Sequence, residues 1–319
     1  MNSEKKFLVS HAPFWHNGSG VPERNYNIII AALPAVLVGL SVFGVPALGV
    51  ICMSVSSAIG WEFAITRLSK RPVTVGDGNA ALIGLLFGML LPATSPWWLV
   101  ITGTFVAILI GQQIFGGIGG NPFNPPALAF AILSIAWKKY LDFDAQLINF
   151  DFNFFGHHPL VAVKAFGPEN IAGLPLSDLL LGRQVGGIGA GCGLALILGG
   201  VYLIARGFVR WEIPIAFIVG LFVTAGLFHM GNPAKYADPL FHLLAGNTLL
   251  GAFFLITDDS SSPVNLVPML IYGLMGGMMV ILIRNIGIYP DGVINAVLVI
   301  NLLNPLLDKI RPKALGKAA

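Results

Sequence analysis

The chain has few charged residues. Of its 319 residues, 10% are Asp, Glu, Lys or Arg and 55% are hydrophobic, and the mean hydropathy is +0.80. Because soluble domains carry about 25% charged residues, this composition excludes an ordinary soluble protein and predicts a chain that crosses a membrane several times. The net charge of +3 is small and no basic stripe interleaves with aromatic residues, so we expect no nucleic acid partner.

Cysteine is also scarce, and several catalytic motifs are missing. Cys52 and Cys192 both lie in apolar runs, which excludes a disulfide framework and a Cys-x-x-Cys cluster. The chain has neither a Walker loop nor a His-Glu-x-x-His motif. We therefore predict no metal site and no catalytic residue.

Ten apolar segments follow one another along the chain. About 20 apolar residues span a bilayer, and shorter segments occur where a membrane helix is broken. We expect an all-α polytopic membrane protein with about ten transmembrane helices in two inverted five-helix repeats. The segments lie near 26–44, 46–66, 79–92, 97–116, 124–138, 187–206, 211–229, 244–257, 264–284 and 290–307.

Positive charges predict the orientation of these segments. Cytoplasmic loops carry an excess of Lys and Arg, and most of the 18 such residues fall on one side if both termini are cytoplasmic. The predicted organisation is a cytoplasmic tail (1–25), a first five-helix repeat (26–138), an outer, periplasmic loop (139–186), a second five-helix repeat (187–308) and a basic cytoplasmic tail (309–319).

A break rich in glycine, asparagine and proline interrupts the first repeat. Residues 116–126 contain Asn121, Asn124, four glycines and three prolines, which cannot continue a helix. Such backbone is tolerated at membrane depth only where protein or a water-filled cavity covers it. The break therefore marks a binding site or a meeting point of two halves, and a plain re-entrant turn is the alternative.

The second half contains an echo of this break at 284–292. Gly78-Asn79 opens the third segment as Gly246-Asn247 opens the eighth. An odd number of helices per repeat inverts one repeat relative to the other, and such folds place ligand sites at broken segments. By the charge count the two breaks lie on opposite faces, so we expect two separate half-sites; chance similarity between apolar segments is the alternative.

Four motifs together resemble the RnfD/NqrB family, and the short N-terminus is more similar to the RnfD branch. They are Asp77-Gly78, Leu91-Pro92-Ala93-Thr94-Ser95-Pro96-Trp97-Trp98, the break at 116–125, and Phe254-Leu255-Ile256-Thr257-Asp258. The resemblance implies a bacterial-type inner membrane and assembly with other membrane and peripheral subunits. It also implies electron transfer between ferredoxin and NAD that is coupled to movement of Na⁺ or H⁺. The chain would be a subunit of such a complex rather than an enzyme by itself.

The same resemblance implies a flavin mononucleotide (FMN) joined by a phosphoester to a threonine in the outer loop, within Ser/Thr-Gly-Ala-Thr-Pro-Leu. The nearest match here is 155–160, where His158 occupies the position of that threonine. No threonine lies between Lys138 and Cys192, and imidazole has no hydroxyl. We therefore expect no covalent FMN; a flavin, if present, would be held without a covalent bond.

Three groups of residues are candidates for binding a cofactor: the glycine run with Arg183, two asparagines, and His158 at the position of the family's threonine. The glycine run with Gly187 and Gly189 opens the sixth segment, where amide groups at a helix start favour phosphate, and Arg183 precedes it. Close helix packing is the alternative for these glycines. Asn121 and Asn124 are the second group. For His157 and His158 we favour a solvated loop pair over haem or metal ligation.

Asp258, Asp259 and Asp291 are candidates for an ion path. Carboxylates near membrane depth are costly and often line such paths, although a cap at a helix end would explain them as well. Two other functions stay open: a channel or transporter for small solutes or ions, and a redox-silent scaffold subunit.

Overall fold

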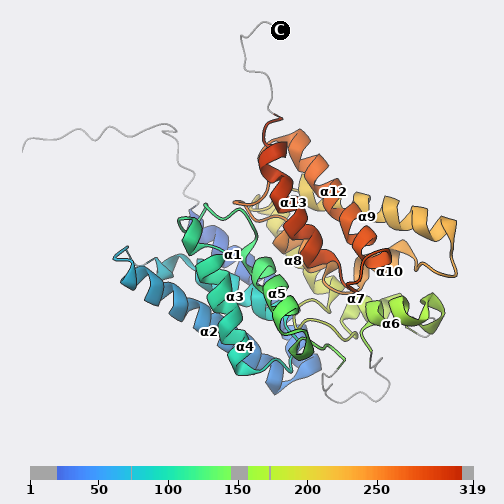
Figure 1. Cartoon of the computed structure of the whole chain (residues 1–319), viewed down its shortest axis with the longest axis horizontal. Helices are drawn as coiled ribbons and strands as arrows, with labels where there is room; N and C mark the ends of the chain where they lie inside the picture. The colour runs from blue at the N-terminus through green and yellow to red at the C-terminus, as the bar shows by residue number, and fades with distance from the viewer. Residues whose placement is uncertain (1–19, 73, 145–156, 172–173, 311–319) are drawn as a thin grey trace, which may run out of the picture.

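The computed structural model describes residues 20–72, 74–144, 157–171 and 174–310, and all regular structure in this part of the chain is helical. Figure 1 shows the helices of the first half beside those of the second half. The first group consists of α1 (Val21–Phe43), α2 (Val45–Leu68), α3 (Asn79–Leu90), α4 (Trp97–Phe105) and α5 (Pro125–Ala136). The second group consists of α8 (Gly193–Ala205), α9 (Glu212–Gly231), α11 (Thr248–Leu250), α12 (Leu266–Asn285) and α13 (Val293–Leu307).

Five of the described helices are long and apolar enough to cross a membrane. They are α1, α2, the run from Trp97 to Phe115 that begins with α4, α9 and α12. Four shorter apolar helices, α3, α5, α8 and α13, lie among them. The prediction of an all-α, multi-pass membrane protein is therefore confirmed.

The predicted segments agree closely with the helices, with two clear exceptions. The first segment is predicted from 26, with residues 1–25 as a tail, but α1 begins at Val21, where Pro22 takes one of the first helical positions. The sequence predicts that the sixth segment begins at 187, but α8 begins at Gly193 because residues 183–192 form turns against the end of α3. Two segments also end in π-helical turns, Val106–Ile110 after α4 and Gly251–Leu255 after α11. Such turns are frequent at functional sites.

Three short helices lie in the connections between the longer ones. They are α6 (Pro159–Phe166), α7 (Leu176–Leu181) and α10 (Pro239–Leu244). The Lys164 ammonium on α6 donates to the backbone carbonyls of Arg284, Gly287 and Tyr289 at 3.1, 2.6 and 2.9 Å. Lys164 therefore links α6 to the turn between α12 and α13.

Glycines let the helices approach each other closely. On α12 a Cβ at Gly277 would collide with the carbonyl oxygen of Phe217 and lie 2.6 Å from the amide nitrogen of Leu221, both on α9. Between the two halves, a Cβ at Gly199 of α8 would collide with the carbonyl of Ala31 on α1. Without a hydrophobic drive between helices in lipid, such close packing is a main source of helix association.

We expect Gly277→Leu to separate α9 from α12, because the new side chain has no space at Phe217. Overpacking of this kind costs about 1–3 kcal/mol, and we expect a lower thermal midpoint of the purified complex. The matched control is Gly226→Leu, since a Cβ at Gly226 on α9 meets nothing within 4 Å. Equal midpoints for the two variants would contradict the packing argument.

Candidate functional site

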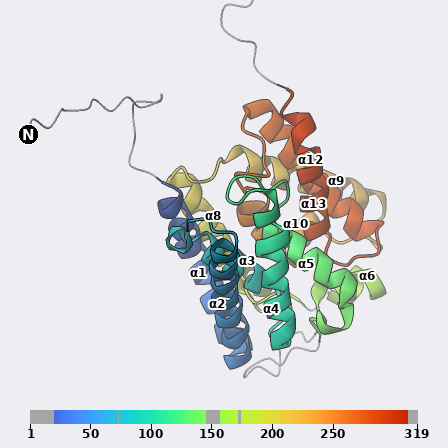
Figure 2. The same ribbon diagram turned by 60° about the vertical axis from the view of Figure 1, so that its left-hand side comes forward.

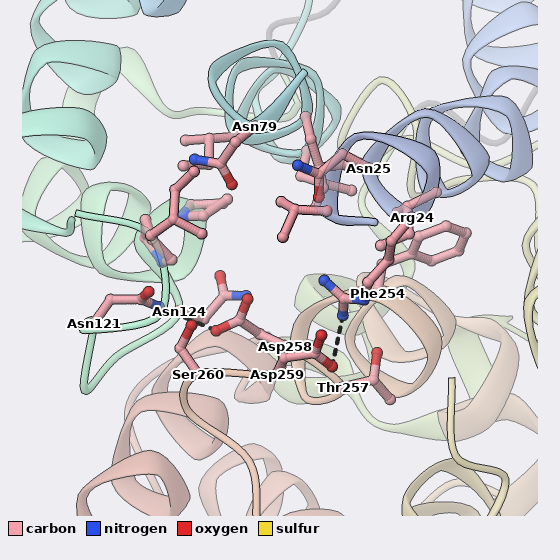
Figure 3. Close-up of a pocket in the computed structure, with 18 of the residues that line it drawn as sticks. Arg24, Asn25, Asn79, Asn121, Asn124, Phe254, Thr257, Asp258, Asp259 and Ser260 are labelled. Carbon is pink, nitrogen blue, oxygen red and sulfur yellow. Dashed lines mark hydrogen bonds and ion pairs between the residues drawn. The ribbon is translucent and has the colours of Figure 1, made fainter. Parts of the chain in front are cut away.

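Two cavities with polar residues among apolar ones lie apart from each other in the described part of the chain and share no lining residue. We call the cavity beside the first turn of α1, which Arg24 lines, the inner cavity; its volume is about 230 Å³. Residues of both halves line it, and Figure 3 shows them facing a common space. Those with polar side chains are Arg24, Asn25, Asn79, Gln112, Asn121, Asn124, Thr257, Asp258, Asp259 and Ser260.

Asp258 is the most enclosed carboxylate of the inner cavity. Its Oδ2 accepts hydrogen bonds from Asn121 Nδ2 at 3.1 Å and from Ser261 Oγ at 3.0 Å. Burial raises the pKa of Asp258, although Ser261 and the positive charge of Arg24 oppose the rise. The break of the first half, through Asn121, thus directly holds a carboxylate of the second half.

Asn124 explains why the break ends where it does. Its Oδ1 accepts from the amide of Ala127 at 3.0 Å and so caps the N-terminus of α5. Its Nδ2 donates at 3.0 Å to the carbonyl oxygen of Leu255, at the end of the π turn in the second half. One buried amide therefore satisfies a free donor in one half and a free acceptor in the other.

Charge in the inner cavity is unbalanced. Arg24 Nη2 lies 2.8 Å from Asp259 Oδ1, and this leaves Asp258 as the second carboxylate beside a single guanidinium. Gln112 is 2% exposed, and its Oε1 is buried without a hydrogen-bond partner. A buried acceptor without a donor and an excess of negative charge together favour a cation in this cavity.

We call the second cavity, whose lining residues include Asp291 and His158, the outer cavity; its volume is about 550 Å³. His158 is 3% exposed, and its backbone amide donates to Asp144 Oδ1 at 2.6 Å. Burial lowers the pKa of His158, while Asp291 and Asp144 oppose the change. The expectation of a solvated histidine pair is wrong for His158, which is buried with its ring centroid 5.4 Å from that of Phe143. His157 is exposed.

Asp291 belongs to a buried ion pair rather than to the inner cavity. Its Oδ1 lies 2.9 Å from Arg284 Nη2, and its Oδ2 accepts from the backbone amide and the Nδ2 of Asn247 at 2.8 and 2.7 Å. Burial by itself raises the pKa of Asp291, but the Arg284 guanidinium and the Asn247 amide outweigh burial and hold it below the usual range. Asp258 and Asp259 therefore lie together, and Asp291 lies in a different cavity.

The sequence model of the NQR2, RnfD, RnfE family matches residues 8–316. The chain belongs to this family. It is 34% identical over 346 aligned positions to the D-type subunit of the ion-translocating oxidoreductase complex of Cronobacter sakazakii, with 97% of this chain and 99% of that one covered. It is also 34% identical over 310 positions to the D-type subunit of the Na⁺-translocating ferredoxin:NAD⁺ oxidoreductase complex of Acetobacterium woodii, with coverage of 96% and 94%.

Membership in the NQR2, RnfD, RnfE family confirms the resemblance drawn from the four motifs. The relatives' names place those proteins in multi-subunit, ion-translocating oxidoreductases. The chain is therefore a membrane protein of a family whose members serve electron transport and ion translocation, and a stand-alone solute channel is not favoured.

In this family member the glycine run near Arg183 packs against the end of α3. The amides of Ile188 and Gly189 donate to the carbonyls of Leu91 and Met89 at 3.1 and 3.0 Å. A Cβ at Gly187 would lie 2.6 Å from the same Met89 carbonyl, and Arg183 faces Asp178 at 3.9 Å. The amides of Ile188 and Gly189 are therefore occupied by the end of α3, and α8 begins only at Gly193.

Sequence reasoning misses several polar residues of the two cavities. Arg24 and Gln112 lie in or beside apolar segments, and Lys138 has only the pattern of a loop charge. Asn79 and Asn247 each follow a glycine near the start of a segment, and this repeated Gly-Asn pair could have identified them. In the structure both glycines have a positive φ, +73° at Gly78 and +67° at Gly246. Among the described residues, no group of three His, Cys, Asp or Glu could hold a metal ion.

We expect Asp291→Asn to destabilise the protein strongly. The Arg284 side chain is 2% exposed, and removal of the partner of a buried charge costs about 3–5 kcal/mol. The exposed pair of Arg183 and Asp178 supplies the control, because Arg183→Gln removes an interaction worth about 0–1 kcal/mol. Thermal unfolding of the purified complex measures both; similar losses would show that Asp291 is not a structural anchor.

Proposed function

We propose that this chain is the membrane-embedded D-type subunit of an ion-translocating oxidoreductase complex in a bacterial-type inner membrane. Electron transfer between ferredoxin and NAD, carried by partner subunits, would drive Na⁺ or H⁺ across the membrane. The names of relatives that align over nearly their whole length support this proposal.

Within this proposal the chain has ten spans in two inverted halves and both termini in the cytoplasm. Helices at matching places in the two halves support the repeat, because their starts are separated by a similar number of residues. In one pair α2 begins at Val45 and α9 at Glu212, and in another α4 begins at Trp97 and α12 at Leu266. Figures 1 and 2 place the first residues of α1 and the last residues of α13 toward the same end. We assign that end, where Arg24 lines the inner cavity, to the cytoplasm.

The inner cavity is the cation-binding part of the route in this proposal. The observation that carries it is the enclosed Asp258 beside the unpartnered Oε1 of Gln112, in a cavity that also contains Asp259. Carboxylate and amide oxygens are ligands that hard cations prefer. Asn121 positions Asp258 and is a positioning residue.

An unbonded flavin is the second candidate occupant of the inner cavity. The side-chain amides of Asn79, Asn121 and Asn124 offer donors and acceptors like those that complement the polar edge of a flavin ring. Asn79 Nδ2 is buried without a partner. If Asn121→Ala releases flavin from the complex and Asp258→Asn leaves cation transport unchanged, the occupant of this cavity is the flavin and not the cation.

We expect Asp258→Asn to weaken the apparent affinity of the complex for Na⁺ about tenfold or more, since an interaction with a charged group contributes about 1.5–3 kcal/mol. Electron-transfer-driven Na⁺ uptake into proteoliposomes measures it, and a pH-sensitive dye reports H⁺ transport in Na⁺-free buffer. Asp178→Asn in the outer loop is the control. Wild-type transport of both ions by the Asp258 variant would overturn the proposed site.

The raised pKa of Asp258 predicts competition between protons and the transported cation. A protonated carboxyl group is a poor cation ligand, so the apparent Na⁺ affinity should fall as the pH decreases through the raised pKa. The loss should begin at a higher pH than for an exposed aspartate, because burial favours the neutral form. In Asp258→Asn this pH dependence of Na⁺ affinity should disappear; its persistence would assign the titration to another group.

A further inference from the structure

The outer cavity combines apolar walls with buried polar atoms that have no partner. Phe130, Phe143 and Ile294 are among its apolar lining residues. His158 Nδ1 and Asn247 Oδ1 are buried without a hydrogen-bond partner, and both residues are at most 3% exposed. Buried polar atoms are nearly always hydrogen-bonded in proteins, so these two atoms point to a ligand with its own donors and acceptors.

Two lysines bring ammonium groups to the lining of the outer cavity. Lys138 and Lys139 line it, and the structure records no ion pair for either among the described residues. Of the carboxylates that line the cavity, Asp291 is neutralised by Arg284, and Asp144 accepts the His158 amide. Asp142 accepts the amide of Asp144 at 3.0 Å. An amide hydrogen bond leaves the negative charges of Asp142 and Asp144 in place, so the cavity is not positive overall. The ammonium groups of Lys138 and Lys139 are the cationic lining groups that can bind an anionic group such as a phosphate.

The residues at this cavity do not fit a phosphoester bond. A phosphoester needs a hydroxyl group, and the position implied for the acceptor carries the imidazole of His158. Within the described ranges, Ser134 is the only Ser or Thr that lines the cavity. Its hydroxyl already donates to the carbonyl of Ala131 within α5 at 2.8 Å, as Ser side chains on helices commonly do.

We propose that the outer cavity binds FMN, a flat aromatic ring system with one phosphate, by non-covalent contacts alone. Lys138 and Lys139 meet the phosphate, while His158 and Asn247 bond to polar atoms of the ring. The volume of about 550 Å³ lies within the range of about 300–1,000 Å³ for small-molecule sites. The choice of FMN rests on the electron transfer of the proposed function, whereas the cavity argument stands without it.

The test uses the assembled complex with its flavin removed, titrated with FMN and with riboflavin, which lacks the phosphate. Ligand fluorescence measures binding. We expect FMN to bind at least about tenfold more tightly than riboflavin, and Lys138→Ala/Lys139→Ala to remove this difference without weakening riboflavin binding. Lys235→Ala is the control, because Lys235 lies over the ring of Tyr236 instead.

A second measurement identifies the bond and the cavity. After acid precipitation, FMN should remain in the supernatant and the chain should keep its unmodified mass. His158→Gln should weaken the binding of both FMN and riboflavin, because the substitution removes the buried imidazole that bonds to the ring system they share. A flavin adduct on the chain, equal affinities for FMN and riboflavin, or lysine variants without effect would overturn the proposal. Asp258→Asn should leave FMN binding unchanged, so failure of the proposed cation site is distinguishable from failure here.

Discussion

The structure depends on one constraint of the membrane: peptide groups released where a helix breaks must find partners inside the protein. Asn124 meets this constraint for both halves at once. It donates to the carbonyl of Leu255 in the second half and accepts from the amide of Ala127 in its own half. A break that weakens one half alone therefore becomes a contact that joins the two halves.

The break at 284–292 is held by the charged side chain of Arg284, whereas the break at 116–126 is held by the side-chain amide of Asn124. Arg284 donates to the carbonyls of His242 and Ala245, to the hydroxyl of Thr248, and to Asp291. These bonds satisfy the ends of short helices that lipid could not satisfy. The same bonds occupy Asp291, and so the two breaks, although related in sequence position, provide different chemistry. The first break leaves Asp258 enclosed beside unpartnered polar atoms, while the second leaves unpartnered atoms beside lysines.

Much of the helical framework could be predicted from the sequence, because apolar runs and proline-rich breaks act locally. The start of α8 could not, since Gly187 lies against the end of α3 and the amides of Ile188 and Gly189 donate to carbonyls there. The burial of His158 could not be predicted either, because its surroundings include residues far away in the sequence, such as Asp291 and Arg284.

The sequence by itself determined the membrane class, the family, and the lack of any threonine between Lys138 and Cys192. These follow from composition and from residues read in order. Only the tertiary structure decided that Asp258 and Asn121 share one cavity and that Asp291 belongs to another. The physical reason is that Asn121 and Asp258 are 137 positions apart in sequence. Such a hydrogen bond exists only after the helices of both halves have packed.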